Sequence, residues 1–409
     1  MESELVFDCS PSTPIGIPTL AKMALEGSDL SSVWNSLVTR VNVEPRDAAA
    51  FMDLSTIAYI QGRPKDRSIL RSRALELQRI YRQAPATTTT EGVRLLAFMS
   101  AADYLPNMPI EFLLKGSSVT LDMLYIVPGR PLPQPLPEHD VALVAVAESG
   151  ENQSVLQEIA ALVPSWPRPV INRPDRIARL TRDGTWHLLR DAVGVVIPMN
   201  VRIDRSSFAQ MALGEVPVEC ALDGKTFPII ARPVDSHLGE GLSKLDSPTA
   251  MNAYLQERPE SEFYIAPFMD YSGPDGLFRK YRIALIDGRP YAVHMAVAQH
   301  WMINYINADM KNSAQKRAEE ERFMLDFDVD FAVRHRIALN SIAERIGLEY
   351  LPFDCAETHD GKLLVFETGT NMIVHALDSP EIFPYKRPQM NKVFAAFREM
   401  LINAVRKGS

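Results

Sequence analysis

Cysteine, long apolar runs and a basic N-terminus are all missing or scarce in this sequence. The three cysteines, Cys9, Cys220 and Cys355, are far apart and lack metal-ligand spacing, so neither a disulfide framework nor a cysteine metal site is expected. No stretch approaches the ~20 apolar residues of a membrane span. The longest clean run, VALVAVA at 141–147, is typical of a buried strand. The first residues, MESELVFDCS, lack the basic start and apolar run of a signal peptide. These absences predict a soluble, cytoplasmic protein without a membrane partner.

Positive charge is in deficit, because 43 lysines and arginines stand against 51 aspartates and glutamates, for a net charge of -8. This balance disfavours nonspecific binding to nucleic acid or to an anionic membrane surface. No glycine-rich strand-to-helix turn follows LLAFMS or LYIVP, which argues against a dinucleotide-dependent oxidoreductase. A Ser-His-Asp or Cys-His signature is also missing. We therefore expect no nucleic-acid partner and no side-chain nucleophile.

The hydrophobic pattern changes along the 409 residues, which are enough for two or three domains. Residues 18–82 carry apolar residues at helical spacing, with a break at Gly62-Arg63-Pro64. Strand-like and helical segments then alternate, and antiparallel strands with interspersed helices follow. The predicted regions are a helical N-terminal region (1–90), a small parallel α/β domain (91–175) and an α+β domain (176–409) with two lobes (about 176–265 and 266–409). The predicted fold class is thus α/β and α+β.

A hairpin near the C-terminus brings two acidic residues together. Asp360-Gly361 predicts a two-residue turn, in which both central positions need φ > 0. Such a turn places Asp354 opposite Glu367, and like charges directly opposite destabilise a sheet by up to ~1 kcal/mol. Either the pair lies on a solvated face, or it holds a divalent cation such as Mg²⁺, which takes oxygen ligands. Asn371 would add an amide oxygen to such a site.

A second hairpin, FRKYRIALIDG, is basic. Lys280 and Arg282 share one face of its first strand, which indicates either a solvated edge or a nearby anion. A two-residue turn at Asp287-Gly288 would place Tyr281 opposite His294. We interpret His294 as a packed or hydrogen-bonded histidine.

A glycine-bearing loop lies within PIIARPVDSHLGEGL. Ser236, His237, Gly239 and Gly241 would form a flexible β-loop-β flap, because no helix follows as it would in a Rossmann or P-loop site. Backbone N–H groups of such a flap can cover phosphates. Arg232, on the preceding strand, either reaches the same phosphates or is a surface cation.

The order of these features resembles the ATP-grasp superfamily, which includes glutathione synthetase and D-alanine–D-alanine ligase. The shared order is a basic strand and glycine flap, an extended stretch ending in an acid (YIAPFMD), a basic strand, and an acid–hairpin–Glu-x-x-x-Asn finish. The resemblance covers roughly 170–409, and the preceding α/β layer is similar to the small domain that usually precedes the grasp domain. The whole chain is similar to bacterial ATP-grasp proteins with N-terminal tetratricopeptide-like helices.

The resemblance implies a role for each matching residue. Arg182 and Arg232 match two basic positions that contact ATP phosphates, where lysine is more usual, and the flap would close over the triphosphate. The adenine hinge would be Ile265, Ala266, Pro267 and Phe268, and Asp270 would hold the ribose. Arg282 matches the arginine that steadies the transferred phosphoryl group. The candidates for substrate contact are His237, Arg279, Lys280, His294 and Trp301.

The implied metal ligands are Asp354, Glu367 and Asn371. The family commonly has an Asn two residues after the Glu, where this sequence has Gly369, so Asn371 would substitute from a shifted loop.

These roles imply an ADP-forming ligase that uses ATP and Mg²⁺ to join a carboxylate to an amine through an acyl phosphate. Its partners would be a small-molecule carboxylate and amine, or a peptide. The N-terminal helices would bind a peptide, pack against the enzyme or form a homodimer. The alternative is an ATP-binding regulatory or scaffold protein without ligase turnover, which the arginines in place of lysines and Gly369 in place of Asn favour.

Overall fold

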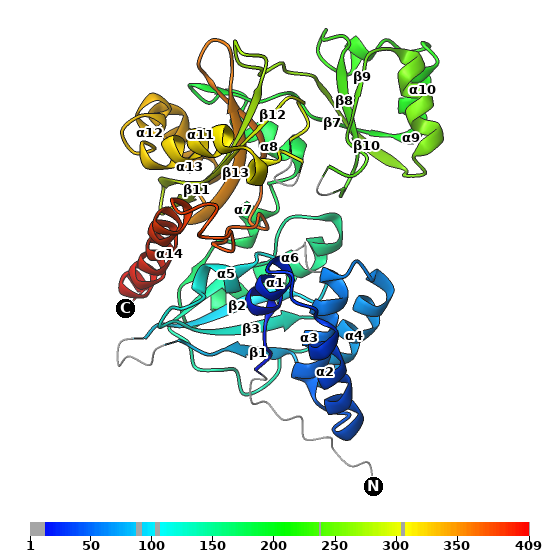
Figure 1. The fold of residues 1–409 in the computed structure, drawn as a ribbon. Coiled ribbons are helices and arrows are strands. Elements are labelled where there is room, and N and C mark those ends of the chain that lie inside the picture. Colours follow the sequence, from blue (N-terminus) through cyan, green and yellow to red (C-terminus); the bar gives the residue numbers. More distant parts are fainter. Residues whose placement is uncertain (1–12, 87–91, 103–106, 237–238, 304–306, 409) are drawn as a thin grey trace.

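The computed structural model describes residues 13–86, 92–102, 107–236, 239–303 and 307–408 (Figure 1). Within these ranges the chain forms a five-stranded sheet that is mostly parallel, a four-stranded antiparallel sheet and a second five-stranded sheet that is mostly antiparallel. This arrangement confirms the predicted α/β and α+β class. No helix in the described ranges is long and apolar enough to cross a membrane. Cys9 and His237 lie outside the described residues.

Helices dominate the N-terminal region, as predicted. They are α1 (Ile17–Leu25), α2 (Ser31–Val43), α3 (Ala48–Ile60) and α4 (Pro64–Leu77). The Asp47 carboxylate caps α3 by accepting a hydrogen bond of 2.9 Å from the Ala50 N–H, and Pro64 starts α4, where its missing N–H costs nothing. Leu20, Leu37 and Ile57 belong to a small apolar core of their own.

The helical spacing that the sequence shows up to residue 82 does not persist as a helix, because α4 ends at Leu77 and residues 80–83 form a strand. This strand, β1 (Ile80–Gln83), pairs with β3 (Thr120–Ile126) at the edge of the first sheet. Ile80 and Tyr81 are fully buried there. Long-range pairing therefore overrides the local helical pattern.

The first sheet has the strand order β1-β3-β2-β4-β5. Its other elements are β2 (Arg94–Ser100), α5 (Ile110–Leu114), β4 (Val141–Val144), α6 (Gln153–Leu162) and β5 (Val170–Ile171). Apart from β1 its strands are parallel, so their carboxyl ends meet at one edge. Asn107 and Val146 form an isolated bridge just beyond the ends of β2 and β4. In open α/β sheets this edge is where ligands bind.

The four-stranded sheet forms a lobe with its own apolar core, at the upper right of Figure 1. Its elements are β7 (Val201–Asp204), α9 (Arg205–Ala212), β8 (Ile229–Pro233), β9 (Ser243–Leu245), α10 (Pro248–Glu257) and β10 (Glu262–Pro267). Strand β8 pairs antiparallel with β9, and the residues that the structure describes between them form no helix. The predicted β-loop-β arrangement of the flap is therefore present.

The third sheet has the order β12-β11-β13-β14-β6 and shares one large core with the first sheet. Its region contains α7 (Pro174–Ile177), α8 (Arg182–Leu189), β6 (Val195–Val196), β11 (Phe278–Ile286), β12 (Arg289–Ala298), α11 (Ala314–Leu325), α12 (Phe331–Arg334), α13 (Arg336–Ile346), β13 (Tyr350–Glu357), β14 (Leu363–Thr368) and α14 (Lys386–Gly408). β6 pairs with β14 and α8 packs against α13 and β14. These two segments thus pack with the second of the two expected lobes.

The turn at Asp287-Gly288 has two residues, with φ of 47° and 76°, as predicted. A register shift in β12 follows, so that Arg282, rather than Tyr281, lies opposite His294. A β-bulge of this kind moves every later residue by one position. The bulge therefore brings His294 next to the basic face of β11.

The Asp360-Gly361 pair does not form the predicted two-residue turn. Thr358 and Lys362 close a three-residue loop: the Lys362 N–H donates to the Thr358 hydroxyl at 2.9 Å, and of the loop residues only Gly361 has a positive φ, 75°. A second register shift, between β13 and β14, offsets the longer loop. Asp354 consequently faces Glu367, as expected, although the turn differs.

Two buried carboxylates anchor the start of α1, and one gives a pH-dependent prediction. Asp53 is 1% exposed and accepts hydrogen bonds from the Ile15 and Gly16 N–H groups at 2.8 and 3.1 Å, while Glu111 accepts from the backbone at Ile17. Burial raises the pKa of Asp53 to about 6, although both backbone bonds oppose the shift. The folded protein therefore holds a proton on Asp53 that the unfolded chain releases near pH 4. Stability must fall as pH rises through that interval.

We expect the free energy of unfolding to lose about 3 kcal/mol from Asp53 between pH ~4 and ~7. An Asp53→Asn variant cannot ionise, so its stability profile should be flatter than that of the wild type over this interval. Thermal unfolding of both proteins across the interval measures the difference. Parallel profiles would contradict the assignment.

Candidate functional site

A row of four polar side chains, which we call the charged row, crosses the third sheet. The strand registers place His294 opposite Arg282, Arg282 opposite Asp354, and Asp354 opposite Glu367. Directly opposite residues point to the same face of a sheet. The two hairpins that the sequence singled out are therefore neighbours, and their charged faces coincide.

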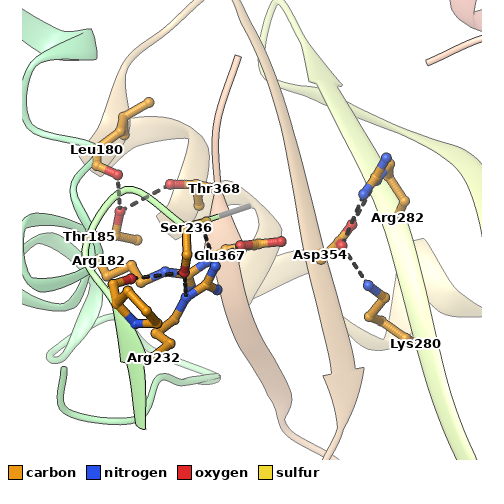
Figure 2. A network of polar contacts seen from close by, with 11 residues as sticks. Leu180, Arg182, Thr185, Arg232, Ser236, Lys280, Arg282, Asp354, Glu367 and Thr368 are labelled. Carbon is orange, nitrogen blue, oxygen red and sulfur yellow. Dashed lines mark hydrogen bonds and ion pairs between the residues drawn. The ribbon is translucent and has the colours of Figure 1, made fainter. Parts of the chain in front are cut away.

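The Asp354 carboxylate accepts hydrogen bonds from two basic side chains of β11 (Figure 2). Arg282 donates from Nε to Oδ1 at 2.7 Å and from Nη2 to Oδ2 at 3.0 Å, and Lys280 Nζ donates to Oδ2 at 3.0 Å. The Asp354 side chain is 1% exposed. Burial alone would raise the pKa of Asp354, but Arg282 and Lys280 hold it well below its usual range. The positive charge beside this carboxylate is thus supplied by the protein itself.

Glu367 pairs with Arg182, the first residue of α8. Two contacts fix α8: Thr181 caps it by accepting from the Gly184 N–H at 3.0 Å, and Thr185 lies 3.1 Å from Thr368, hydroxyl to hydroxyl. The Glu367 side chain is 36% exposed, so it remains accessible, unlike Asp354. Arg182 and the neighbouring Arg232 hold the pKa of Glu367 below its usual value, against the effects of burial and of Asp354.

Arg232, on β8, is a buried guanidinium without a bonded carboxylate among the described residues. Its hydrogen bonds there go to Ser236, from Nε to Oγ at 3.0 Å and from Nη2 to the carbonyl oxygen (Figure 2). Arg232 is only 7% exposed. Burial and the nearby Arg182 lower the pKa of Arg232 to about 9, which still leaves it charged at neutral pH. A buried, directly unneutralised cation beside a second arginine is a site prepared for an anion.

The flap next to Arg232 needs its glycines. Gly239 and Gly241 have φ of 82° and 66°. A Cβ on Gly241 would lie 2.5 Å from the ring Cδ of Pro233, so no larger residue fits without rearrangement. The Ser236 hydroxyl donates to the Pro233 carbonyl at 2.8 Å, which folds the start of the flap over Arg232.

The proposed adenine hinge lies along β10. Ile265 pairs with β8 on one side and β7 on the other, whereas the pairing with β7 goes no further than this residue. Ala266, Pro267 and Phe268 therefore follow β8 along one edge only. Asp270, just beyond, accepts from the Ser272 N–H at 2.9 Å. The backbone available for reading a base thus begins at Ala266 rather than at Ile265.

The structure separates the four substrate candidates that it describes. Lys280 contacts the row through its bond to Asp354, and His294 is part of the row. Burial together with Arg282 lowers the pKa of His294 well below its usual value. Arg279 points away, toward Glu319 and Asp275, with the Asp275 carboxylate at 2.7 Å. The Trp301 ring packs on Phe268, with centroids 5.7 Å apart, beside the expected hinge. Arg279 is therefore not brought to the site.

Oxygen donors suited to Mg²⁺ lie at the end of β14. The Asn371 amide oxygen is 2.8 Å from the point where a Cβ on Gly369 would stand. Because residue 369 is glycine, the Asn371 amide can occupy the space that a side chain at position 369 would fill. Position 369 is the one where the family commonly has its asparagine. No group of three or more His, Cys, Asp or Glu side chains able to hold a metal occurs in the described ranges. Mg²⁺ needs only one or two carboxylates when phosphates supply its other ligands.

Glu367 and Asn371 therefore fit a magnesium ion that arrives with phosphates. Asp354 fits less well in this arrangement, because both of its oxygens already accept hydrogen bonds from Arg282 or Lys280.

Sequence reasoning missed several contacts of the site. Lys244, on β9, lies over the Phe268 ring, 4.1 Å from its centroid. The Tyr264 hydroxyl donates to Asp183 at 2.9 Å and so links β10 to α8. Glu148, after β4, has its pKa raised to about 7 by burial and by nearby Asp235 and Asp183. Only Lys244 had a local sequence signal, because it alternates with Leu245 on a short strand. The other contacts join segments that are distant in the sequence.

Comparisons with known proteins give structural similarity alone. No family model and no curated protein matches the sequence. Among solved structures, the chain is similar to the VanG D-Ala:D-Ser ligase of Enterococcus faecalis, with 14% identity, a TM-score of 0.47, and coverage of 77% of this chain and 100% of that one. It is also similar to a RimK domain ATP-grasp protein of Sphaerobacter thermophilus (15%, 0.42, 75% and 99%). A third is the D-alanine–D-alanine ligase of Bacillus anthracis complexed with ATP (14%, 0.42, 78% and 100%). All three TM-scores are below 0.5, so the roles of individual residues rest on the contacts within this chain.

Proposed function

We propose that this protein is an ADP-forming ligase that uses ATP and Mg²⁺ to join a carboxylate to an amine. The observation that carries the proposal is Arg232, a buried guanidinium that bonds to no carboxylate in the described residues and lies beside Arg182 and the flap. Such a cation is costly to bury unless an anion neutralises it. The triphosphate of ATP would supply that anion, with flap N–H groups covering it.

The row across the third sheet supplies the remaining parts. Glu367 and Asn371 would hold Mg²⁺, which would supply charge neutralisation at the phosphate oxygens. Asp354 orients Arg282 and Lys280, which would hold the transferred phosphoryl group and the substrate carboxylate in contact. Phosphoryl transfer needs positioning and charge stabilisation more than covalent chemistry by the protein.

The proposed reaction balances without a side-chain nucleophile. A carboxylate oxygen attacks the γ-phosphorus of ATP, the bond to the bridging oxygen breaks, and ADP leaves with that electron pair. The amine nitrogen then attacks the acyl carbon, inorganic phosphate leaves, and the nitrogen loses a proton to form the amide. His294, with its lowered pKa, stays neutral beside Arg282 and adds no competing charge. We expect the protein to work in the cytoplasm on a small molecule or peptide.

One observation favours a second candidate, an ATP-binding regulatory or scaffold protein without turnover. Asp354, expected to hold the metal, is already saturated by Lys280 and Arg282. A site whose second carboxylate cannot reach the metal would bind nucleotide without completing phosphoryl transfer.

An ADP-release assay separates the two. Purified protein receives Mg²⁺ and ATP with pooled carboxylates and amines, and ADP is measured together with ATP affinity. The ligase predicts carboxylate-dependent ADP release, reduced by about 100-fold or more in Glu367→Gln, because one charged metal ligand is lost. Arg190→Met, which removes an exposed arginine paired with Asp191 at 3.5 Å, should match the wild type. ATP binding without ADP release favours the scaffold protein. If the protein neither binds ATP nor releases ADP, the proposal is wrong.

A further inference from the structure

An apolar cavity of about 260 Å³ lies where three regions of the chain meet. Helices α1 and α3 form one wall, the segment before and within α5 forms the second, and the segment that follows β14 forms the third. Its lining residues are Ile17, Ala21, Ala24, Leu25, Tyr59, Ile60, Asn107, Pro109, Phe112, Asn371, Ile373, His375 and Leu377. The N-terminal helices thus line a cavity together with the C-terminal part of the chain, which neither could form alone.

The walls of this cavity are uncharged. The Asn107 amide is used by the backbone of Ser100, accepting from its N–H at 2.7 Å and donating to its carbonyl at 3.0 Å. His375 accepts from the Leu377 N–H at Nδ1, and burial lowers its pKa, so the ring is neutral. An apolar cavity of about 150 Å³ is large enough to bind benzene. This cavity therefore has room for one aromatic ring or a branched aliphatic group.

Its position links it to the charged row. Arg282 donates from Nη1 to the Ile373 carbonyl at 3.1 Å, and Ile373 and Asn371 both line the cavity. Asn107 and Pro109 place it beyond the carboxyl end of β2, at the edge of the parallel sheet where ligands bind in such folds. A molecule with its charged end on Arg282 and Lys280 would therefore have its apolar end beside Ile373.

We propose that this cavity binds the apolar substituent of the carboxylate substrate, whose carboxylate contacts Arg282 and Lys280. The proposal rests on the proposed ligase function and names its substrate class: a carboxylic acid with an aromatic or branched aliphatic group. Charge complementarity fixes the orientation, because the cavity itself offers no charge, whereas Arg282 and Lys280 carry two positive charges against the single carboxylate of Asp354. Burying each methylene in such a cavity contributes about 0.8 kcal/mol, roughly fourfold in affinity. The N-terminal helices then act in substrate selection.

Calorimetric titration with two simple acids tests the substituent. With and without Mg²⁺ and ADP, 3-phenylpropanoate is expected to bind at least about 20-fold more tightly than acetate, given its added apolar surface. Filling the cavity with Ala24→Trp should abolish that preference, and Ile373→Trp provides an independent filling from another wall. Thr19→Trp, on the exposed face of α1, is the matched control and should bind both acids like the wild type.

Equal binding of the two acids, no binding of 3-phenylpropanoate, or an unchanged preference in both filled variants would overturn the cavity assignment. A preference for 3-phenylpropylamine that the filled variants lose would overturn it too, since it would put the amine there. Failure of the ligase is distinguishable: the cavity-dependent preference would persist while ADP release stays absent for every acid.

Discussion

Replacing Asp354 with alanine is expected to lower the free energy of unfolding by about 3–5 kcal/mol, because it leaves buried cations without their counter-charge. The side chains of Arg282 and Lys280 are each 17% exposed and meet at this carboxylate. Glu367→Ala should cost much less, since Glu367 is 36% exposed and Arg182 can turn to solvent. Urea unfolding of both variants measures the contrast. Equal, small losses would show that Asp354 does not neutralise the cluster.

Two further variants separate charge from packing. Asp328→Ala removes an exposed carboxylate 3.9 Å from Lys392 and should leave stability nearly unchanged. The triple change Asp354→Leu, Arg282→Met and Lys280→Met replaces the whole cluster with apolar groups of similar size. Such replacements of buried ion clusters are often neutral or stabilising. The triple variant should therefore regain most of the stability that Asp354→Ala loses. It should release no ADP, because the cations proposed to hold the phosphoryl group are gone.

The sequence posed two complementary questions that the structure answers together. The pair Asp354 and Glu367 indicated either a solvated face or a bound cation, and the pair Lys280 and Arg282 indicated either a solvated edge or a nearby anion. Each strand pattern was interpreted correctly, since all four side chains lie on one face. Their mutual pairing was not predictable, because it requires the register between two hairpins, in which the paired residues Arg282 and Asp354 are 72 positions apart. No local periodicity carries that information.

β-Bulges limited the register predictions in the same way. The turn at Asp287-Gly288 was predictable from its dipeptide, but the shift in β12 that moves His294 to Arg282 was not. An inserted residue leaves the alternation of apolar and polar side chains almost intact on either side. At the other hairpin the loop and the shift offset each other, so Asp354 faces Glu367 despite the wrong turn.

The helical and strand elements themselves were mostly predictable, because strong periodicity or caps mark them. α10, for example, begins at Ser247 and Pro248, a pair typical of a helix start, with the Ser247 hydroxyl accepting from the Ala250 N–H at 3.2 Å. β1 was missed, since its burial depends on β3 forty residues away. The contact of Arg182 with Glu367 spans 185 residues, and no feature of the sequence predicted it, although the family resemblance assigned both residues to the nucleotide site.

Removing the Arg232 side chain is expected to raise the free energy of unfolding, whereas removing the Asp354 side chain lowers it. Arg232→Met takes a directly unneutralised charge out of a site that is 7% exposed, so the free energy of unfolding without nucleotide should rise by about 1–4 kcal/mol. Ser236 loses both hydrogen bonds from Arg232, but its hydroxyl still donates to the Pro233 carbonyl. The same change should weaken ATP binding by about 30- to 1,000-fold, the equivalent of 2–4 kcal/mol for a buried partner of phosphate.

Thermal unfolding with and without Mg²⁺ and ATP measures both effects in one experiment, since a ligand stabilises only the state that it binds. The wild type should gain stability with ATP, and Arg232→Met should start higher and gain almost nothing. Arg190→Met, which lacks only an exposed arginine, should follow the wild type in both conditions. Arg232→Met could instead be less stable than the wild type without ATP and still be stabilised by ATP. In that case the guanidinium stabilises the flap and does not bind an anion. Gain of stability paired with loss of ATP binding would mark Arg232 as a residue kept for function at the expense of the fold.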